Sequence, residues 1–206
     1  TLFRAAELYY AGGVWPRAIA TFRSYAHGFE EPADLRLEAM HHMDLLYRRT
    51  EEPAKQRFWL RKIMATVDAQ DGPTTRASTL AGEAAMVLAE DVLAEFRAVA
   101  IAPPLKRSVP RKQKAMVRLI DAMQKVASYE VPGLTSLPTF HIASAYSAMA
   151  EGLLNATPPA GLSELELEQY VILVEEQAFP FEEEAIDIHV INCLLYTSPS
   201  PRDSMT

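Results

Sequence analysis

The chain has 206 residues, a formal net charge of −7 and a hydrophobic fraction of 49%. This length suffices for a helical domain with a core of its own. No apolar run approaches the roughly 20 residues of a membrane span, and a single cysteine, Cys193, excludes a disulfide framework within the chain. Segments rich in Ala, Leu, Met, Glu and Arg, with few glycines and almost no alternating β-branched runs, predict an all-α fold.

Charge is unevenly distributed along the sequence. Residues 1–125 carry 19 Lys and Arg against 15 Asp and Glu, whereas residues 126–192 carry 11 acidic residues and no Lys or Arg. The most basic segment, residues 106–118, has no interleaved aromatic residues and belongs to an acidic chain, so nucleic-acid binding is not expected. We interpret the charged segments as solvated helix faces, or as faces that pack together or recruit different partners.

The first predicted elements are two helices, over residues 2–12 and 15–28, joined by a glycine turn. Gly13 can adopt the positive φ that ends the first helix, and Pro16 suits the first turn of the second. The two helices resemble one tetratricopeptide repeat (TPR), whose signature is W-x2-L-G-x2-Y followed by A-x3-F.

The resemblance rests on residues at both helices' contact positions. Leu2 stands at the Trp position, Ala5-Ala6 at Leu-Gly, Tyr9 at the Tyr, and Ala18 and Phe22 at A-x3-F. The alanines should let the helices approach closely, while the aromatic rings fill the space on either side. The resemblance implies helix pairs stacked as a right-handed solenoid, which binds proteins and needs no cofactor.

Further helices are predicted over residues 34–49, 53–69, 74–99, 110–128, 139–155, 163–178 and 180–192. The spacing Ala54…Phe58 repeats A-x3-F, and Ile142-Ala143-x2-Tyr146 repeats L-G-x2-Y. Ser163-x-x-Glu166 forms a capping box at the start of a helix. Pro180 is expected to separate the last two helices, because proline cannot donate the helical hydrogen bond.

A second resemblance covers residues 107–192. Val126–Tyr129, the stretch from Pro159 to Tyr170 and the acidic stretch from Glu175 to Ile186 are similar to the C-terminal part of bacterial envelope TPR proteins that occur beside gliding-motility and Tol-like machinery. The resemblance implies a periplasmic or outer-membrane-associated adaptor, with the cytoplasm as the alternative location. It supplies no catalytic residues.

The nearest approach to a metal cluster is His41-His42-x-Asp44. Adjacent residues of a helix point about 100° apart, so the two histidines cannot share one ion without another ligand. We therefore favour a packing role. The sequence contains no Walker loop, G-x-S-x-G or H-E-x-x-H motif.

Two acidic clusters, Glu175-Glu176 and Glu182-Glu183-Glu184, have the composition of paired catalytic carboxylates. No nucleophile or third ligand accompanies them. Acids in the first turn of a helix beginning at Pro180 would instead meet a favourable helix dipole. Among the aromatic residues of the first repeat, Tyr10 and Tyr25 lie off the signature positions, and we predict that they line a partner-binding face.

The two ends of the chain are expected to be artificial. Thr1 already lies inside the helical pattern, and Cys193–Asp203 reads as the translation of a transposon-end adapter used in preparing sequencing libraries. We therefore expect one TPR-like helical domain over residues 1–192, a fragment truncated at both ends, and a non-native tail over 193–206. The last helix is expected to continue only to about Leu195 before the chain becomes irregular, and Ala185, Ile186, Ile188 and Ile191 are expected to form a partly exposed apolar strip.

The sequence predicts a non-enzymatic TPR scaffold that binds a protein partner in a bacterial envelope complex. One alternative is a metal-dependent hydrolase that uses His41, His42 and Asp44. The other is a passive spacer within a longer repeat array.

Overall fold

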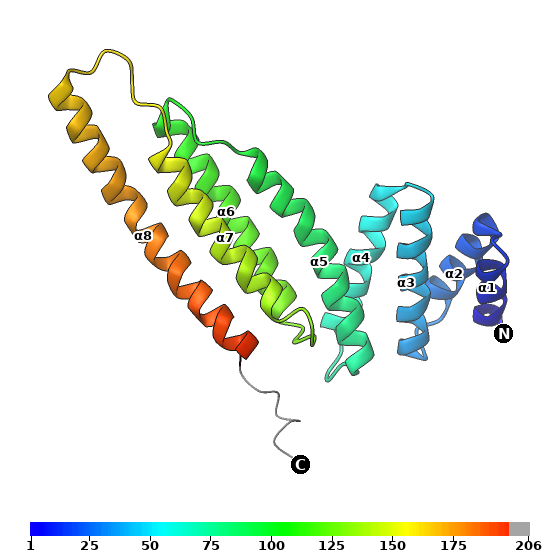
Figure 1. Ribbon diagram of the computed structural model, residues 1–206. Coiled ribbons are helices and arrows are strands. Elements are labelled where there is room, and N and C mark those ends of the chain that lie inside the picture. Colours follow the sequence, from blue (N-terminus) through cyan, green and yellow to red (C-terminus); the bar gives the residue numbers. More distant parts are fainter. Residues whose placement is uncertain (198–206) are drawn as a thin grey trace. The chain divides into compact units, whose positions relative to one another are not determined.

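The computed structural model describes the backbone of residues 1–197 and the side chains as far as residue 193, and in this part it is entirely helical, without strands (Figure 1). The helices are α1 (Leu2–Ala11), α2 (Trp15–Gly28), α3 (Ala33–Arg49), α4 (Pro53–Asp68), α5 (Thr75–Ala98), α6 (Leu105–Ala127), α7 (Ser136–Leu154) and α8 (Glu164–Thr197). The predicted all-α class is confirmed. None of these helices is sufficiently long and apolar to cross a membrane.

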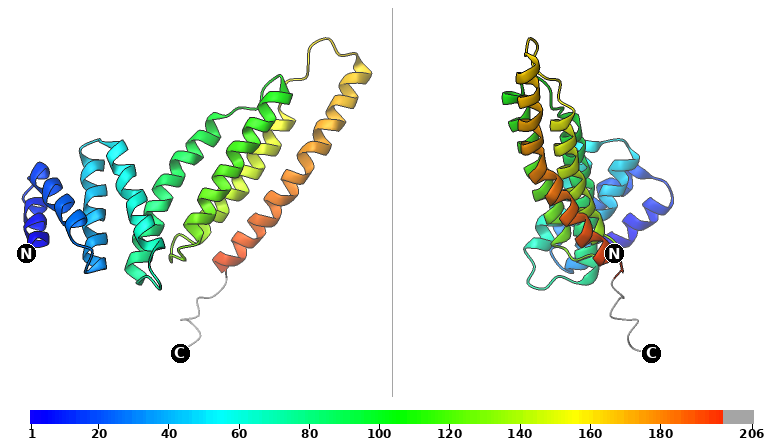
Figure 2. Two further views of the ribbon diagram at one scale, coloured as in Figure 1. Left: turned by 180° about the vertical axis from the view of Figure 1, so that it is seen from behind. Right: turned by 60° about the vertical axis from the view of Figure 1, so that its left-hand side comes forward.

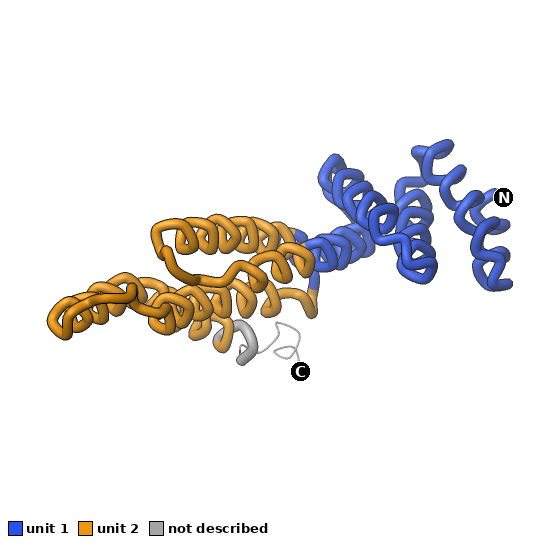
Figure 3. The backbone as a smooth tube through the Cα atoms, turned by 90° about the horizontal axis from the view of Figure 1, so that it is seen from above, with its two compact units in different colours: residues 1–88, 129–131 blue, residues 89–128, 132–206 orange. Residues whose placement is uncertain are grey.

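The chain forms two compact units (Figure 3). Residues 1–88 and 129–131 make up the first, and residues 89–128 together with those from 132 onward make up the second. Helix α5 contributes residues to both, because the division falls after residue 88. The expectation of one domain over residues 1–192 stays a prediction.

In the first unit, α1 packs against α2, α2 against α3, and α3 against α4. Ala6 and Ala18 are fully buried where α1 meets α2, as predicted, and Phe22 lies beside them in the core. Gly13 has φ +72°, the positive value expected of the turn. Tyr9, in contrast, remains half-buried, and the guanidinium of Arg17 lies 5.7 Å from the centre of its ring.

Helix α4 buries a different aromatic residue from the one predicted. Phe58, the aromatic residue of the second A-x3-F match, is 52% exposed, whereas its neighbour Trp59 is 3% exposed. Leu60, Ile63 and Val67 continue the buried face from Trp59. The helical spacing of these apolar residues therefore outweighs the short motif, and the second match does not mark a core position.

In the second unit, α6 packs against α7 and α7 against α8. The core includes small and flexible apolar residues from all three helices: Leu119, Met123, Val126, Ala143, Ala145, Met149, Val174, Ala178 and Ala185. Helix α6 begins at Leu105 rather than at Pro110. Because Pro110 lies early in the helix, its missing N–H removes one bond, to the carbonyl of the exposed Lys106.

Helix α8 is continuous, so the prediction of two helices separated at Pro180 is wrong. It runs alongside α7 over much of its length (Figures 1 and 2). Val174 and Ala178 before the proline and Ala185 after it are all buried. Packing on both sides of Pro180 thus offsets the cost of an interior proline, roughly 3 kcal/mol.

The start of α8 has the predicted capping box. The Ser163 backbone N–H donates to Glu166 Oε2 over 2.8 Å, and the Glu166 N–H is 3.4 Å from Ser163 Oγ. The Ser163 hydroxyl also donates to Glu166 Oε2 over 2.7 Å. These hydrogen bonds satisfy backbone groups that the first turn leaves without partners, and they hold the pKa of Glu166 below its usual value.

At its other end, α8 continues through Thr197, two residues beyond the expected end at about Leu195. The expected apolar strip is mixed, since Ile186 and Ile191 are exposed, Ile188 is half-buried and Ala185 is buried. Residues 198–206, the greater part of the predicted adapter-derived tail, lie outside the described residues. Their predicted origin stays a prediction.

Candidate partner-binding surface

Asp44, which would be a metal ligand in the hydrolase alternative, makes a structural contact between α3 and α4. Its carboxylate is 3% exposed, accepts a hydrogen bond from Gln56 Nε2 over 2.8 Å, and lies 3.3 Å from Arg48 Nη2. The residues that the structure describes contain no group of three or more His, Cys, Asp or Glu side chains arranged to hold a metal ion. The hydrolase alternative therefore has no structural support at His41, His42 and Asp44.

His42 packs as an aromatic residue. Its ring stacks on Phe22 at 4.5 Å and 13°, and it meets the edge of Tyr10 at 4.9 Å. Its Nδ1 atom is buried without a hydrogen-bond partner. Burial, followed by the positive charge of His41, lowers the pKa of His42 below its ordinary value.

This environment predicts a pH-dependent stability. Because the folded state disfavours the imidazolium, the contribution of His42 is complete above the ordinary histidine value of about 6.5 and is lost as the pH falls toward the lower folded pKa. We expect His42→Phe to flatten the loss of unfolding free energy between about pH 7.5 and about pH 5. Urea unfolding at both pH values measures this, and a variant as acid-sensitive as the wild type would contradict it.

The two tyrosines predicted to bind a partner differ in accessibility. Tyr25 is buried and contacts the rings of Phe3 at 5.2 Å and Phe29 at 5.0 Å. Tyr10 is half-buried between His42 and Trp15, whose ring centre lies 5.7 Å away. Tyr25 thus belongs to the packing between α1 and α2. The predicted role of both residues in partner binding stays a prediction.

Residues 106–118, which include six Lys and Arg, do not form a face that is exposed to solvent throughout. Lys112 is buried, and its ammonium donates to the carbonyl of Phe96 over 2.8 Å, near the end of α5. Burial lowers the pKa of Lys112. Arg118 lies 3.1 Å from Glu95. At least two of the six cations therefore contact α5, and they do not form part of a free basic stripe.

Helix α8 exposes a row of large apolar side chains, of which the sequence predicted only Ile186 to be exposed. The row, here called the α8 stripe, consists of Leu165, Ile172, Phe179 and Ile186, which are between 55% and 65% exposed. Seven residues complete nearly two helical turns, so side chains at this spacing lie on one side of a continuous helix. Val174, which packs in the core, lies nearly opposite Ile172, whereas the buried Ala178 and Ala185 point about 100° away from the adjacent stripe residues Phe179 and Ile186.

Carboxylates flank the α8 stripe on both sides. Glu175 and Glu182 follow stripe residues by three positions, and Glu176 and Glu183 follow them by four. On a helix, the residues three and four positions after a given residue are its neighbours, and they lie on opposite sides of it. All four glutamates are exposed. The arrangement is an apolar seam with an acidic border.

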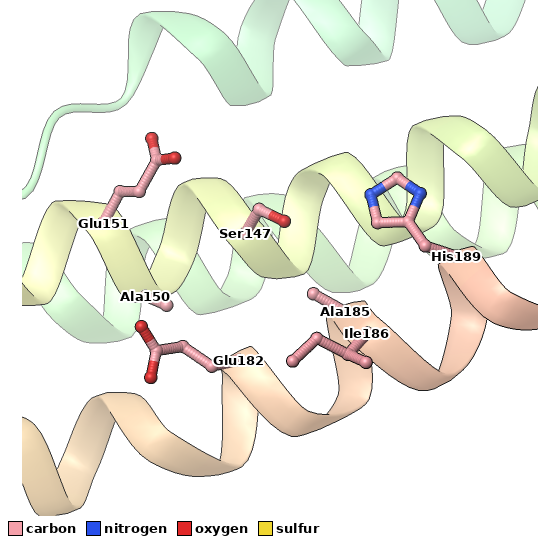
Figure 4. Close-up of a pocket in the computed structure, with 7 residues that line it drawn as sticks. All are labelled: Ser147, Ala150, Glu151, Glu182, Ala185, Ile186 and His189. Atoms are coloured by element: carbon pink, nitrogen blue, oxygen red, sulfur yellow. The ribbon is translucent and has the colours of Figure 1, made fainter.

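A pocket of about 400 Å³ lies between α7 and α8, beside the end of the stripe (Figure 4). Its lining residues are Ser147, Ala150 and Glu151 from α7, and Glu182, Ala185, Ile186 and His189 from α8. The small side chains of Ala150 and Ala185 leave the space open, and Ile186 belongs both to the pocket and to the stripe. Glu151 and Glu182 bring a carboxylate from each helix, which suits a cationic group.

Comparison with known proteins does not place the chain in a family. No protein-family model, no curated protein and no solved structure matches the sequence. The resemblance to TPR proteins therefore rests on the motif residues alone. The function has to be argued from the geometry of the described surface.

Proposed function

We propose that this protein is a non-enzymatic scaffold that binds a protein partner on the exposed side of α8. Helix pairs stacked as in TPR proteins would provide the rigid support. The resemblance of residues 107–192 to envelope TPR proteins extends the proposal to an adaptor in a bacterial envelope complex. The single observation that carries the proposal is the α8 stripe.

Exposure of the stripe favours binding on energetic grounds. Burying a large apolar side chain is worth about 1.5–3 kcal/mol relative to leaving it in water. A contiguous apolar row on a protein surface is therefore typical of an interaction site. Anchors at seven-residue spacing suit an amphipathic helix, which presents a matching row from its own apolar face.

The two alternatives are less well supported. A hydrolase would need a reactive centre, and Asp44 is already bonded to Gln56 and paired with Arg48. A passive spacer would cover the stripe with the next helix of a longer array, and that helix would then need basic residues beside its own apolar row.

Selection of helical peptides tests the proposal. An amphipathic peptide library displayed against the full chain should yield binders, and Ile172→Gln with Phe179→Gln should weaken them about 100-fold or more, since two apolar contacts are lost. The matched control is Leu8→Gln with Phe58→Gln, which replaces two equally exposed apolar residues elsewhere. Circular dichroism and thermal melting verify that both double variants fold.

Two results would refute this function. One is a selection that yields no peptide above background. The other is a set of peptides that bind the Ile172→Gln/Phe179→Gln variant as tightly as the control, since the binding surface would then lie elsewhere.

A further inference from the structure

We infer that the partner is a basic amphipathic helix whose apolar row lies on the α8 stripe, with one Lys or Arg side chain entering the α7/α8 pocket that Glu151 and Glu182 line. This inference rests on the proposed function, and it specifies the chemistry of the partner. Three features of the second unit support it: the charge along α8, the acidic border of the stripe, and the position of the pocket.

The negative charge of α8 has no Lys or Arg nearby in the sequence to balance it. Residues 164–187 carry nine Asp and Glu, and residues 126–192 contain no Lys or Arg at all. The acids of the border cannot be explained by the helix dipole, because α8 does not begin at Pro180 and Glu182 and Glu183 lie in its interior. Clustered carboxylates in the middle of a helix repel one another, and a cationic partner relieves that repulsion.

The acidic border also discriminates among possible occupants. A second copy of α8 would place glutamates against glutamates on both sides of the seam, which disfavours self-association through this surface. An anionic membrane surface repels the same border. A helix with Lys or Arg beside its apolar row complements both the apolar and the charged parts of the surface.

The pocket extends this complementarity to one specific side chain. It opens beside Ile186, the stripe residue that also lines it, so a helix on the stripe brings its flanking side chains to the opening. Glu151 and Glu182 line the pocket from different helices, and Ser147 adds a hydroxyl acceptor. Arginine suits the site, because its planar fork carries five donors and can bond a carboxylate through two of them.

Three synthetic peptides with one common apolar row test the inference. They differ only in the flanking residues, which are Lys and Arg in the first, Gln in the second and Glu in the third. Fluorescence anisotropy titration against the full chain should show the basic peptide binding at least about tenfold more tightly than the Gln peptide, because several charge pairs add. The Glu peptide should bind most weakly, and added salt should weaken the basic peptide selectively.

Substitutions within the pocket test its role separately. Glu151→Gln with Glu182→Gln should weaken the basic peptide about tenfold or more and leave the Gln peptide unchanged, since only the cation contact is lost. Glu184→Gln is the control, because Glu184 is an exposed acid of the same helix that does not line the pocket. It should change neither affinity by more than about twofold, as expected of an exposed charge without a direct contact.

The outcomes distinguish the inference from the function on which it rests. If the Gln or Glu peptide binds as tightly as the basic one, the inference is overturned while the scaffold function stands. If none of the three peptides binds, both fail. Light scattering that shows a dimer of the full chain, lost in Ile172→Gln/Phe179→Gln, would assign the stripe to a second copy and also overturn the inference.

Discussion

Replacing Trp59 by Ala should lower the free energy of unfolding by about 3–5 kcal/mol, the usual cost of emptying a large aromatic site in a core. The side chain is 3% exposed, and its ring lies 5.4 Å from that of His27. Replacing the adjacent Phe58, which is largely exposed, should cost less than about 1 kcal/mol. The two substitutions remove aromatic rings from neighbouring positions, so their difference isolates burial.

Urea unfolding of Trp59→Ala, Phe58→Ala and the wild type measures the two costs. The two costs distinguish the structure from the A-x3-F motif, because the motif places Phe58 in the core and so predicts the larger cost for Phe58→Ala. Equal costs, or a larger cost at Phe58, would show that α4 is rotated about its axis relative to the structure described here.

Replacing Asp44 by Ala should cost about 1–3 kcal/mol, because it leaves the Gln56 amide without its acceptor at the buried contact between α3 and α4. The Arg48 side chain is largely exposed, so water can solvate it and the loss of that ion pair adds little. Asp44→Asn should cost less than Asp44→Ala, since its amide oxygen can still accept from Gln56 Nε2.

Chemical unfolding of both variants, with and without zinc or a chelator, checks this prediction. We expect neither zinc nor the chelator to change the stability of the wild type, because the carboxylate is engaged by Gln56 and Arg48. Stabilisation by stoichiometric zinc that disappears in Asp44→Ala would contradict the structural role and revive the hydrolase alternative.

Only part of the candidate site could be predicted from the sequence. The sequence shows directly that residues 126–192 are acidic and contain no Lys or Arg. The predicted apolar strip over residues 185–191 shares one residue, Ile186, with the α8 stripe. The full row does not follow from the sequence, because Pro180 predicts a helix break in the middle of it. Two separate helices place Leu165 and Ile172 independently of Phe179 and Ile186, so their common seven-residue spacing has no meaning until α8 is known to be continuous.

Local signals determined the all-α class, most helix boundaries and the capping box at Ser163, since propensity, proline placement and side-chain-to-backbone hydrogen bonds act within a few residues. Tertiary packing decided what those signals could not. It buried Trp59 rather than Phe58, because the face of a helix that is covered depends on its neighbours. It also keeps α8 continuous at Pro180, because the free energy gained from packing on both sides of the proline exceeds the cost of one lost hydrogen bond and a steric clash.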